Sequence, residues 1–197
     1  MELVKSVYDN QHELLTALLR LHVPGGIDAD VTYSKGMFYR HGIPEPEYKY
    51  DLNPSEVGVM YADCRKLPIP NGWFGSLMFD PPFVAAGRKK YDTGKVAERF
   101  TKYPGNMDDL WRFYRDSMKE FYRVLSLGGV LIFKCQDVVA GGKNYFSHIF
   151  IANTAQIIGF VLKDLFVLTT NRRLGQWNLK RQIHARKYHC YFMVFKR

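Results

Sequence analysis

Four consecutive residues, Asp80, Pro81, Pro82 and Phe83, carry groups that could do chemistry together. The Asp80 carboxylate and the Pro81 carbonyl are two acceptors, and each could accept one N–H of an amino group at roughly 2.6 to 3.2 Å. Proline has a fixed φ and no N–H, so two in succession would hold that carbonyl in one direction. The Phe83 ring offers a stacking face. This set suits an exocyclic amine of adenine or cytosine, whose lone pair must leave conjugation before the nitrogen can attack.

The same four residues could instead form an ordinary turn, because Pro-Pro sequences commonly end strands. An Asp-Pro-Pro-aromatic sequence is expected by chance in on the order of one in several hundred chains of this length. Here it directly follows an apolar run at 77–79. Its position after a predicted buried strand therefore favours a functional site.

Three further aspartates, Asp30, Asp51 and Asp63, also lie at the ends of predicted strands. Ligands of open parallel sheets bind outside the carboxyl ends of the strands, so these carboxylates and Asp80 would line one edge, a geometry suited to a nucleoside-bearing cofactor. Taken singly, Asp51 could close a turn through its side chain and Asp63 could be a solvated loop carboxylate. Asp28 could also fill the place of Asp30.

The elements that must position these residues follow from hydrophobic periodicity and from turn residues. Helices alternate with short apolar strands, which indicates a mostly parallel sheet with helices on both faces. Helices are predicted at 3–21, 107–125 and 145–158, and extended segments at 27–33, 48–52, 57–61, 76–79, 130–133, 165–169 and 189–195.

Composition restricts the class of protein and its partners. A chain of 197 residues that is 47% hydrophobic is expected to form one domain. The net charge of +9 favours an anionic partner such as nucleic acid. The three cysteines include no CxxC pair, which argues against a disulfide framework or a zinc site. Without a signal sequence or a long apolar run, we expect a cytoplasmic protein that has no membrane segment. We also expect no bound metal, because the chain has no CxxC pair and His184 suits a loop or phosphate contact better than a ligand role.

At the Asp80 turn the chain resembles the amino-methyltransferases of DNA, whose signature is Asp/Asn/Ser-Pro-Pro-aromatic. The segment at 30–36, DVTYSKG, is similar to the first cofactor motif of that family, Asp-Pro-Phe-x-Gly-x-Gly. Asp30 and Gly36 match that motif, whereas Ser34 stands where the family usually has glycine.

Other segments match the family in the same order. The segment at 50–54 looks like the second motif, whose acidic residue, here Asp51, holds the ribose hydroxyls of the cofactor. The segment at 62–68 is similar to the third motif. There an aspartate, here Asp63, accepts from the adenine amino group, and the next residue, here Cys64, packs on the ring. The segment at 122–130 resembles the one before the fifth strand of the family.

The resemblance implies a Rossmann-like class I methyltransferase fold with a mostly parallel seven-stranded sheet, helices on both faces and a C-terminal antiparallel hairpin. It implies S-adenosylmethionine as the cofactor and methylation of an exocyclic amino group in DNA, with adenine N6 favoured over cytosine N4. Catalysis would depend on the turn at 80–83. The implied cofactor-binding residues are Asp30, Thr32, Tyr33, Ser34, Gly36, Asp51, Asp63, Cys64 and Asp80.

Two basic stretches, 84–107 and 170–188, are candidate substrate loops within a single domain of 1–197. Their cations could hold phosphates while their aromatic residues stack on bases, although each could also be an ordinary solvated loop. His184 fits a loop or phosphate contact better than a metal ligand. The candidate substrate-binding residues are Arg88, Lys89, Lys90, Arg172, Arg173, Lys180 and Arg181.

Other functions stay open from the sequence. The same chemistry could act on RNA, or the chain could be a catalytically idle nucleic-acid-binding subunit of a methyltransferase complex. Methylation of a protein glutamine amide is a third alternative, which the charge of +9 disfavours. The length leaves no room for a separate target-recognition domain. We therefore expect short or relaxed specificity, or sequence readout by a partner chain.

Overall fold

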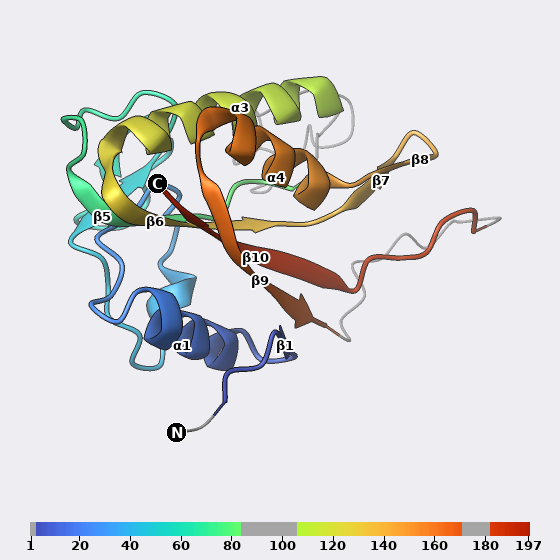
Figure 1. Ribbon diagram of the computed structural model, residues 1–197, viewed down its shortest axis with the longest axis horizontal. Coiled ribbons are helices and arrows are strands. Elements are labelled where there is room, and N and C mark those ends of the chain that lie inside the picture. Colours follow the sequence, from blue (N-terminus) through green and yellow to red (C-terminus); the bar gives the residue numbers. More distant parts are fainter. Residues whose placement is uncertain (1–2, 84–105, 171–181) are drawn as a thin grey trace.

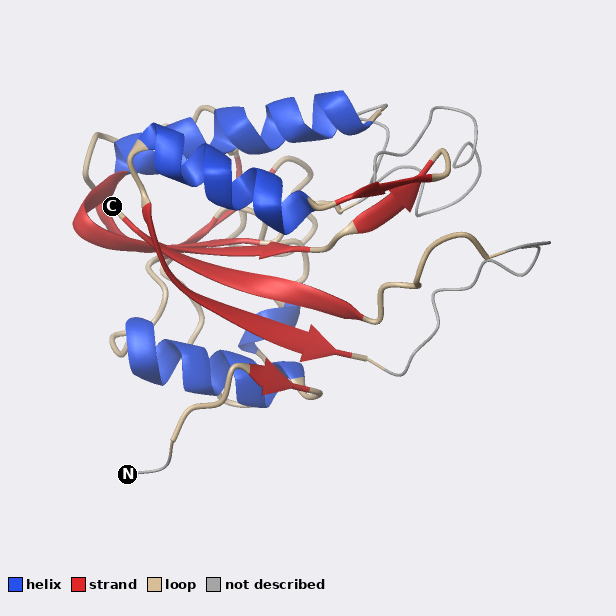
Figure 2. Ribbon diagram, turned by 45° about the vertical axis from the view of Figure 1, so that its right-hand side comes forward, coloured by secondary structure: helices blue, strands red, loops and turns tan. Residues whose placement is uncertain are grey.

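The computed structural model describes residues 3–83, 106–170 and 182–197. In these residues a sheet of eight strands lies between two layers of helices (Figures 1 and 2). The strand order is β1-β9-β10-β6-β5-β2-β3-β4. The strands are β1 (Val7–Tyr8), β2 (Ala29–Asp30), β3 (Tyr48–Asp51), β4 (Met60–Tyr61), β5 (Phe74–Phe79), β6 (Leu125–Cys135), β9 (Val161–Thr169) and β10 (His189–Lys196).

Most neighbouring strands run parallel, and β10 is the exception. It lies between β6 and β9 and pairs antiparallel with both. The other five pairings of the sheet are parallel. This confirms the predicted Rossmann-like architecture with a C-terminal antiparallel hairpin, and the described sheet has one strand more than the seven expected.

The two helical layers bury separate hydrophobic cores against the sheet. Helices α3 (Met107–Val124) and α4 (Ser147–Ile158) cover one face, and α1 (Gln11–His22) with the short 3-10 helix η1 (Met37–Tyr39) covers the other (Figure 2). The central strand β5 is buried at every position except Gly75, as expected for a parallel strand covered on both faces. The ring of Phe79 packs 4.8 Å from those of Phe121 and Phe133, which fixes the end of β5 against α3 and β6.

The prediction that the first helix begins at residue 3 is wrong. Helix α1 begins at Gln11 because Asn10 caps it, its Oδ1 accepting the N–H groups of His12 at 2.9 Å and Glu13 at 3.3 Å. The residues before the cap form β1, which pairs parallel with β9. Leu3, which the periodicity placed on the helix, is 84% exposed.

A second difference is a hairpin that the sequence did not predict. Strands β7 (Val138–Ala140) and β8 (Lys143–Tyr145) pair antiparallel outside the main sheet. Helix α4 consequently begins at Ser147 instead of residue 145, and it ends at Gly159, whose φ of +117° suits a helix terminus. Among the described residues, no helix is both long and apolar enough to cross a membrane.

Candidate functional site

The carboxyl ends of three neighbouring strands bring together Asp30, Asp80 and Lys134. Strand β5 lies between β2 and β6, with Asp30 aligned to Met78 and Phe133 aligned to Phe79. The next residues along β5 and β6 are Asp80 and Lys134. The predicted convergence of Asp30 and Asp80 at one edge of the sheet is therefore present, and a lysine that we did not assign joins them.

Asp80 is held by its backbone and by its carboxylate. Its N–H donates to Thr32 Oγ1 at 2.7 Å, and its Oδ2 lies 3.3 Å from Lys134 Nζ. The side chain is 28% exposed, so it faces neither open solvent nor a closed core. Burial raises the pKa of Asp80, and the positive charge of Lys134 opposes this rise. A carboxylate in this position can accept a hydrogen bond from a polar group that enters from solvent.

The turn that follows Asp80 is anchored to helix α3. Tyr114, which is fully buried on that helix, donates its O–H to the Pro82 carbonyl at 2.8 Å. Pro81 is buried, whereas Pro82 and Phe83 are half-buried. The two fixed proline φ angles and the buried tyrosine together give the turn one conformation.

Asp30 is the most buried acid of the site, with 1% exposure. Its Oδ1 accepts the Thr32 N–H at 2.8 Å, and its Oδ2 accepts the Tyr39 O–H at 2.7 Å. Burial raises the pKa of Asp30 to about 7, the negative charge of Asp80 adds to the rise, and the hydrogen bonds from Thr32 and Tyr39 oppose it. Thr32 thus links the two aspartates, since it bonds to the Asp30 carboxylate and to the Asp80 backbone.

The register of β5 separates Asp30 from Asp28, the alternative that the sequence left open. Asp28 Oδ2 accepts the N–H groups of Gly75 at 2.6 Å and Ser76 at 3.1 Å, near the beginning of β5. Asp28 therefore lies toward the opposite edge of the sheet from Asp80, and Asp30 alone of the two reaches the site.

The loop after β2 approaches the site with an unusual backbone. Ser34 and Gly36 have φ angles of +52° and +61°. A Cβ at Gly36 would collide with the ring of Tyr33, which stacks on Tyr39 with centroids 5.5 Å apart. Glycine is thus required at position 36 by both backbone and space. Ser34 stands where the resembled family usually has glycine, and it adopts the left-handed conformation although it has a side chain.

Asp51 joins this loop to the end of β3. Its Oδ2 accepts the Ser34 N–H at 2.9 Å and its Oδ1 accepts the Asn53 N–H at 2.7 Å. The turn-closing role considered from the sequence is therefore present. The bond to Ser34 also places Asp51 beside the loop at 33–36, where the ribose-binding role remains a prediction.

Asp63 and Cys64 have partners within the protein. Asp63 accepts the Arg65 N–H at 2.9 Å and pairs with its guanidinium at 2.6 Å, which lowers the pKa of Asp63. The Cys64 Sγ is buried 3.4 Å from Ser117 Oγ of α3, and burial raises its pKa to about 12. The thiol therefore lies in the core beneath α3, and an adenine amine at Asp63 would share the carboxylate with Arg65.

Lys134 is a residue of this site that the sequence placed at a strand end and to which we assigned no role. It is 13% exposed, and its Nζ lies 4.9 Å, 5.4 Å and 5.6 Å from the ring centroids of Phe38, Phe192 and Phe83. Aromatic faces attract a cation, so the three rings and Asp80 hold the charge in one place. The available signal was a single lysine following the apolar run at 130–133.

A polar cluster beyond β6 fixes the neighbouring elements. Asp137, 3% exposed, accepts from His148, whose Nδ1 lies 2.7 Å from Asp137 Oδ1, and from the Tyr191 O–H at 3.4 Å. It also accepts the backbone N–H of His148 in the first turn of α4 at 3.3 Å. Asp137 therefore ties together the end of β6, the start of α4 and strand β10.

The remaining predicted residues concern substrate and metal. All seven candidate substrate-binding residues lie outside the described part of the chain: Arg88, Lys89, Lys90, Arg172, Arg173, Lys180 and Arg181. Within the described residues, no group of three or more His, Cys, Asp or Glu side chains could hold a metal ion.

Comparison with known proteins finds matches among solved structures. No family model and no curated protein matches the sequence. A chain of the complex between the Haloferax volcanii Trm112 methyltransferase activator and its methyltransferase matches with a TM-score of 0.57 and 11% identity, over 95% of this chain and 89% of that one. TrmN from Thermus thermophilus matches with a TM-score of 0.55 and 15% identity, over 93% of this chain.

A third similar structure is an S-adenosylmethionine-dependent methyltransferase from Mesorhizobium loti, with a TM-score of 0.50 and 15% identity over 94% of this chain and 98% of that one. The chain spans about half the length of TrmN, 48%, and of a DNA modification methylase from Thermus thermophilus, 50%. At these identities the likeness concerns architecture. The chain therefore has the Rossmann-like fold of the S-adenosylmethionine-dependent methyltransferases.

Proposed function

We propose that this chain, as a single domain of 1–197, methylates an exocyclic amino group of a nucleobase in DNA with S-adenosylmethionine, adenine N6 being favoured over cytosine N4. The observation that carries the proposal is the position of Asp80. Its half-buried carboxylate lies at the carboxyl end of the central strand, on a proline turn anchored by Tyr114 that ends in Phe83.

The residues around Asp80 fit the proposed cofactor. When bound, S-adenosylmethionine supplies an electrophilic methyl group on a positively charged sulfur. Asp30 is a buried carboxylate whose pKa of about 7 a nearby cation would lower. The loop with Thr32, Tyr33, Ser34 and Gly36 would hold the methionine part, and Asp51, Asp63 and the backbone at Cys64 would hold the adenosine. Gly36 keeps this loop in a left-handed turn with no side chain against Tyr33.

The groups of the turn would prepare the amine for attack. The Asp80 carboxylate accepts one N–H of the substrate amine and the Pro81 carbonyl accepts the other, which favours the pyramidal nitrogen that develops during attack. Tyr114 keeps the turn in place through Pro82. Once the nitrogen has gained a carbon it carries one proton too many, and Asp80 is placed to take that proton.

Lys134 supports this role of Asp80 through charge. Burial alone would favour a protonated Asp80, which would be a poor acceptor, and Lys134 favours the charged form. The same cation lies 5.6 Å from the centroid of the Phe83 ring. Lys134 therefore orients the Asp80 carboxylate and keeps it ionised, while Phe83 offers the face on which the base stacks.

A nucleic acid fits the charge of the protein better than a protein glutamine does. The net charge of +9 favours a phosphodiester substrate. The target base must leave its duplex to reach the turn, and basic loops at 84–107 and 170–188 would hold the strand beside it. RNA is a second candidate substrate. Readout by a partner chain and a cytoplasmic location stay predictions.

The experiment that tests the proposal is methyl transfer by Asp80→Ala. Wild type, Asp80→Ala and a control, Asp108→Ala in the exposed first turn of α3, are incubated with labelled cofactor and matched DNA and RNA. Cofactor affinity is measured by calorimetry. We expect Asp80→Ala to lose transfer while it binds cofactor as wild type does, and Asp108→Ala to keep both.

Nucleoside analysis of the product then identifies the substrate. N6-methyladenine or N4-methylcytosine in DNA supports the proposal. Methylation of RNA alone would show that the substrate is RNA and not DNA. Turnover retained by Asp80→Ala contradicts the assigned chemistry. Nucleic-acid binding by wild type without any transfer contradicts it as well, in favour of an idle binding subunit.

A further inference from the structure

The hairpin β7–β8 projects from the edge of the sheet at which Asp80 lies. It begins three residues beyond the end of β6, on the side toward which β6 and β9 point (Figure 1). Ala140 pairs with Lys143, and the turn between them is formed by Gly141 and Gly142, with φ angles of +55° and +75°. The tip therefore has no side chains of its own, and a ligand could approach its backbone closely.

A segment distant in sequence is fastened to this hairpin. His184 Nε2 lies 2.7 Å from the Gly142 carbonyl and His184 Nδ1 lies 3.1 Å from Asn144 Nδ2. A carbonyl can only accept, so His184 Nε2 donates to Gly142. Lys187 Nζ also lies 5.7 Å from the ring centroid of Phe146. Residues 138–146 and 182–188 thus form one surface, which we call the hairpin surface.

The hairpin surface combines positive charge with exposed rings. Residues 138–146 and 182–188 contain Lys143, Arg186 and Lys187, and no aspartate or glutamate. Phe146 is 47% exposed and Tyr188 is 38% exposed. Surfaces that bind nucleic-acid strands use this combination, with cations on the phosphates and rings on the bases. Lys187 is also held beside the Phe146 ring of the hairpin.

The base of the surface is rigidly connected to the candidate active site. Asp137 precedes β7 and bonds to His148 and Tyr191, while Lys134, three residues earlier, bonds to Asp80. A strand held on the hairpin surface would consequently be held at a fixed position relative to the acceptor turn.

We propose that the hairpin surface binds the phosphodiester backbone of the nucleic acid next to the base that enters the site at Asp80. Lys143 and Lys187 contact phosphates, and Phe146 offers a face to a neighbouring base. The inference rests on the proposed function for the identity of the substrate. Lys187 belongs to the loop at 170–188 considered from the sequence, and the inference adds the hairpin β7–β8, which belongs to neither that loop nor the one at 84–107.

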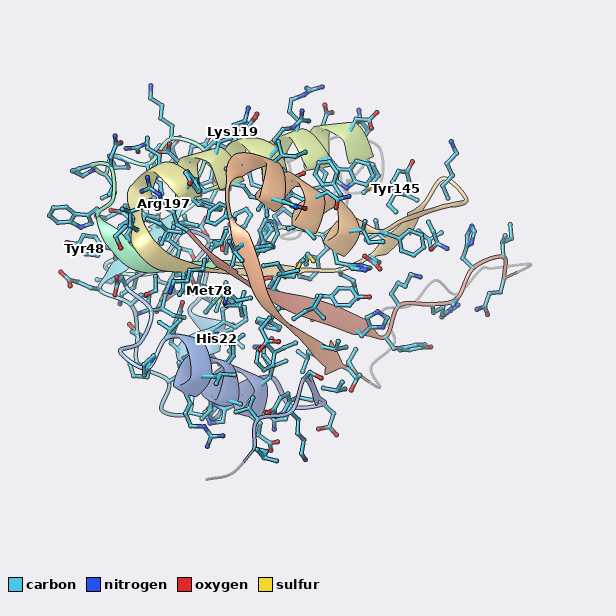
Figure 3. The ribbon with its side chains drawn as sticks, viewed as in Figure 1. His22, Tyr48, Met78, Lys119, Tyr145 and Arg197 are labelled. Carbon is cyan, nitrogen blue, oxygen red and sulfur yellow. The ribbon has the colours of Figure 1, made fainter. Side chains whose placement is uncertain are left out.

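The salt dependence of binding tests the proposal. Fluorescence anisotropy measures the affinity of labelled single-stranded DNA, duplex DNA and RNA for wild type and for the double variant Lys143→Ala/Lys187→Ala. The control is Lys119→Ala/Lys163→Ala, which removes two exposed lysines, one from the outer side of α3 (Figure 3) and one near the start of β9. Both double variants change the net charge equally.

Loss of two phosphate contacts should reduce the slope of log K against log salt by about 1.8 for a duplex and about 1.4 for a single strand. We expect this reduction for the hairpin variant and an unchanged slope for the control. Equal slopes for the hairpin variant and wild type would overturn the proposal, as would equal reductions in the two double variants. The nucleic acid for which the reduction reaches the value expected for its form is the one that this surface binds.

Methyl transfer separates failure of this inference from failure of the proposed function. The hairpin variant should raise the KM for nucleic acid and leave kcat and cofactor affinity within about threefold of wild type. Transfer by wild type with no effect of the hairpin variant on the slope or on KM would refute the surface alone. Full slope changes without transfer by wild type would refute the methyltransferase proposal and leave the surface in place.

Discussion

Replacing Lys134 by methionine would leave Asp80 without its cation. Lys134 Nζ lies 3.3 Å from Asp80 Oδ2, and burial already raises the pKa of that carboxyl. The proposed reaction needs the charged carboxylate, so transfer is lost as the pH falls through the pKa of Asp80. Without the lysine that pKa is higher, and activity should be lost at a higher pH.

The size of this effect follows from the distance and the burial. Two unit charges about 4 Å apart interact by roughly 4 kcal/mol at an effective dielectric constant of about 20, which corresponds to about three pH units. Lys134 is 13% and Asp80 28% exposed, so solvent screens part of the interaction. We therefore expect the acid limb of the pH–rate profile to move upward by about one to three pH units.

The assay is kcat/KM against pH, from about pH 5 to 9, for wild type, Lys134→Met and Lys134→Arg. The arginine variant keeps the positive charge, so its acid limb should stay near that of wild type. Calorimetric cofactor binding shows whether each variant is folded. An acid limb of Lys134→Met that coincides with that of wild type would refute the idea that Lys134 sets the charge of Asp80.

Two further predictions test the supports of the site. Tyr114→Phe removes the donor at 2.8 Å from the Pro82 carbonyl. This should lower the free energy of unfolding by about 1 to 3 kcal/mol, measured by urea unfolding, and it should lower kcat at unchanged cofactor affinity. Asp30 has a pKa of about 7 when folded, against 3.8 for an ordinary aspartate, so between these values the folded protein holds the proton more tightly and loses stability as pH rises. Urea unfolding should show the stability of wild type relative to Asp30→Asn falling by roughly 4 kcal/mol across this range; a constant difference would contradict the assignment.

The parts of the site that the sequence could predict are those marked by local residue types. The turn at 80–83 stands out because two prolines and an aromatic follow an apolar strand, and the structure places it at a strand end. The roles of Asp28 and Asp30 could not be separated, because residues two apart in a strand look alike until the register with β5 is known. Lys134 depends on rings contributed by three separate segments, and no local pattern reveals such a contact.

In the fold as well, elements marked by local sequence patterns could be predicted, and elements that depend on distant strands could not. The helix at 107–124 and the strands beside it follow from periodicity, and Gly159 marks the end of α4. The pair Gly141-Gly142 was a hairpin signal that the helical pattern starting at 145 obscured. Strand β1 has only two residues, and its partner in β9 lies at the other end of the chain, so its existence depends on the finished sheet.

The place of β10 between β6 and β9 has a consequence for biosynthesis. Until residues 189–196 leave the ribosome, β6 and β9 each have an unsatisfied edge with free N–H and C=O groups. Such edges recruit other chains, so a stalled or nicked polypeptide that lacks this segment should aggregate or bind chaperones. The insertion of one late strand therefore joins the two halves of the sheet and ends the period in which the nascent chain is vulnerable.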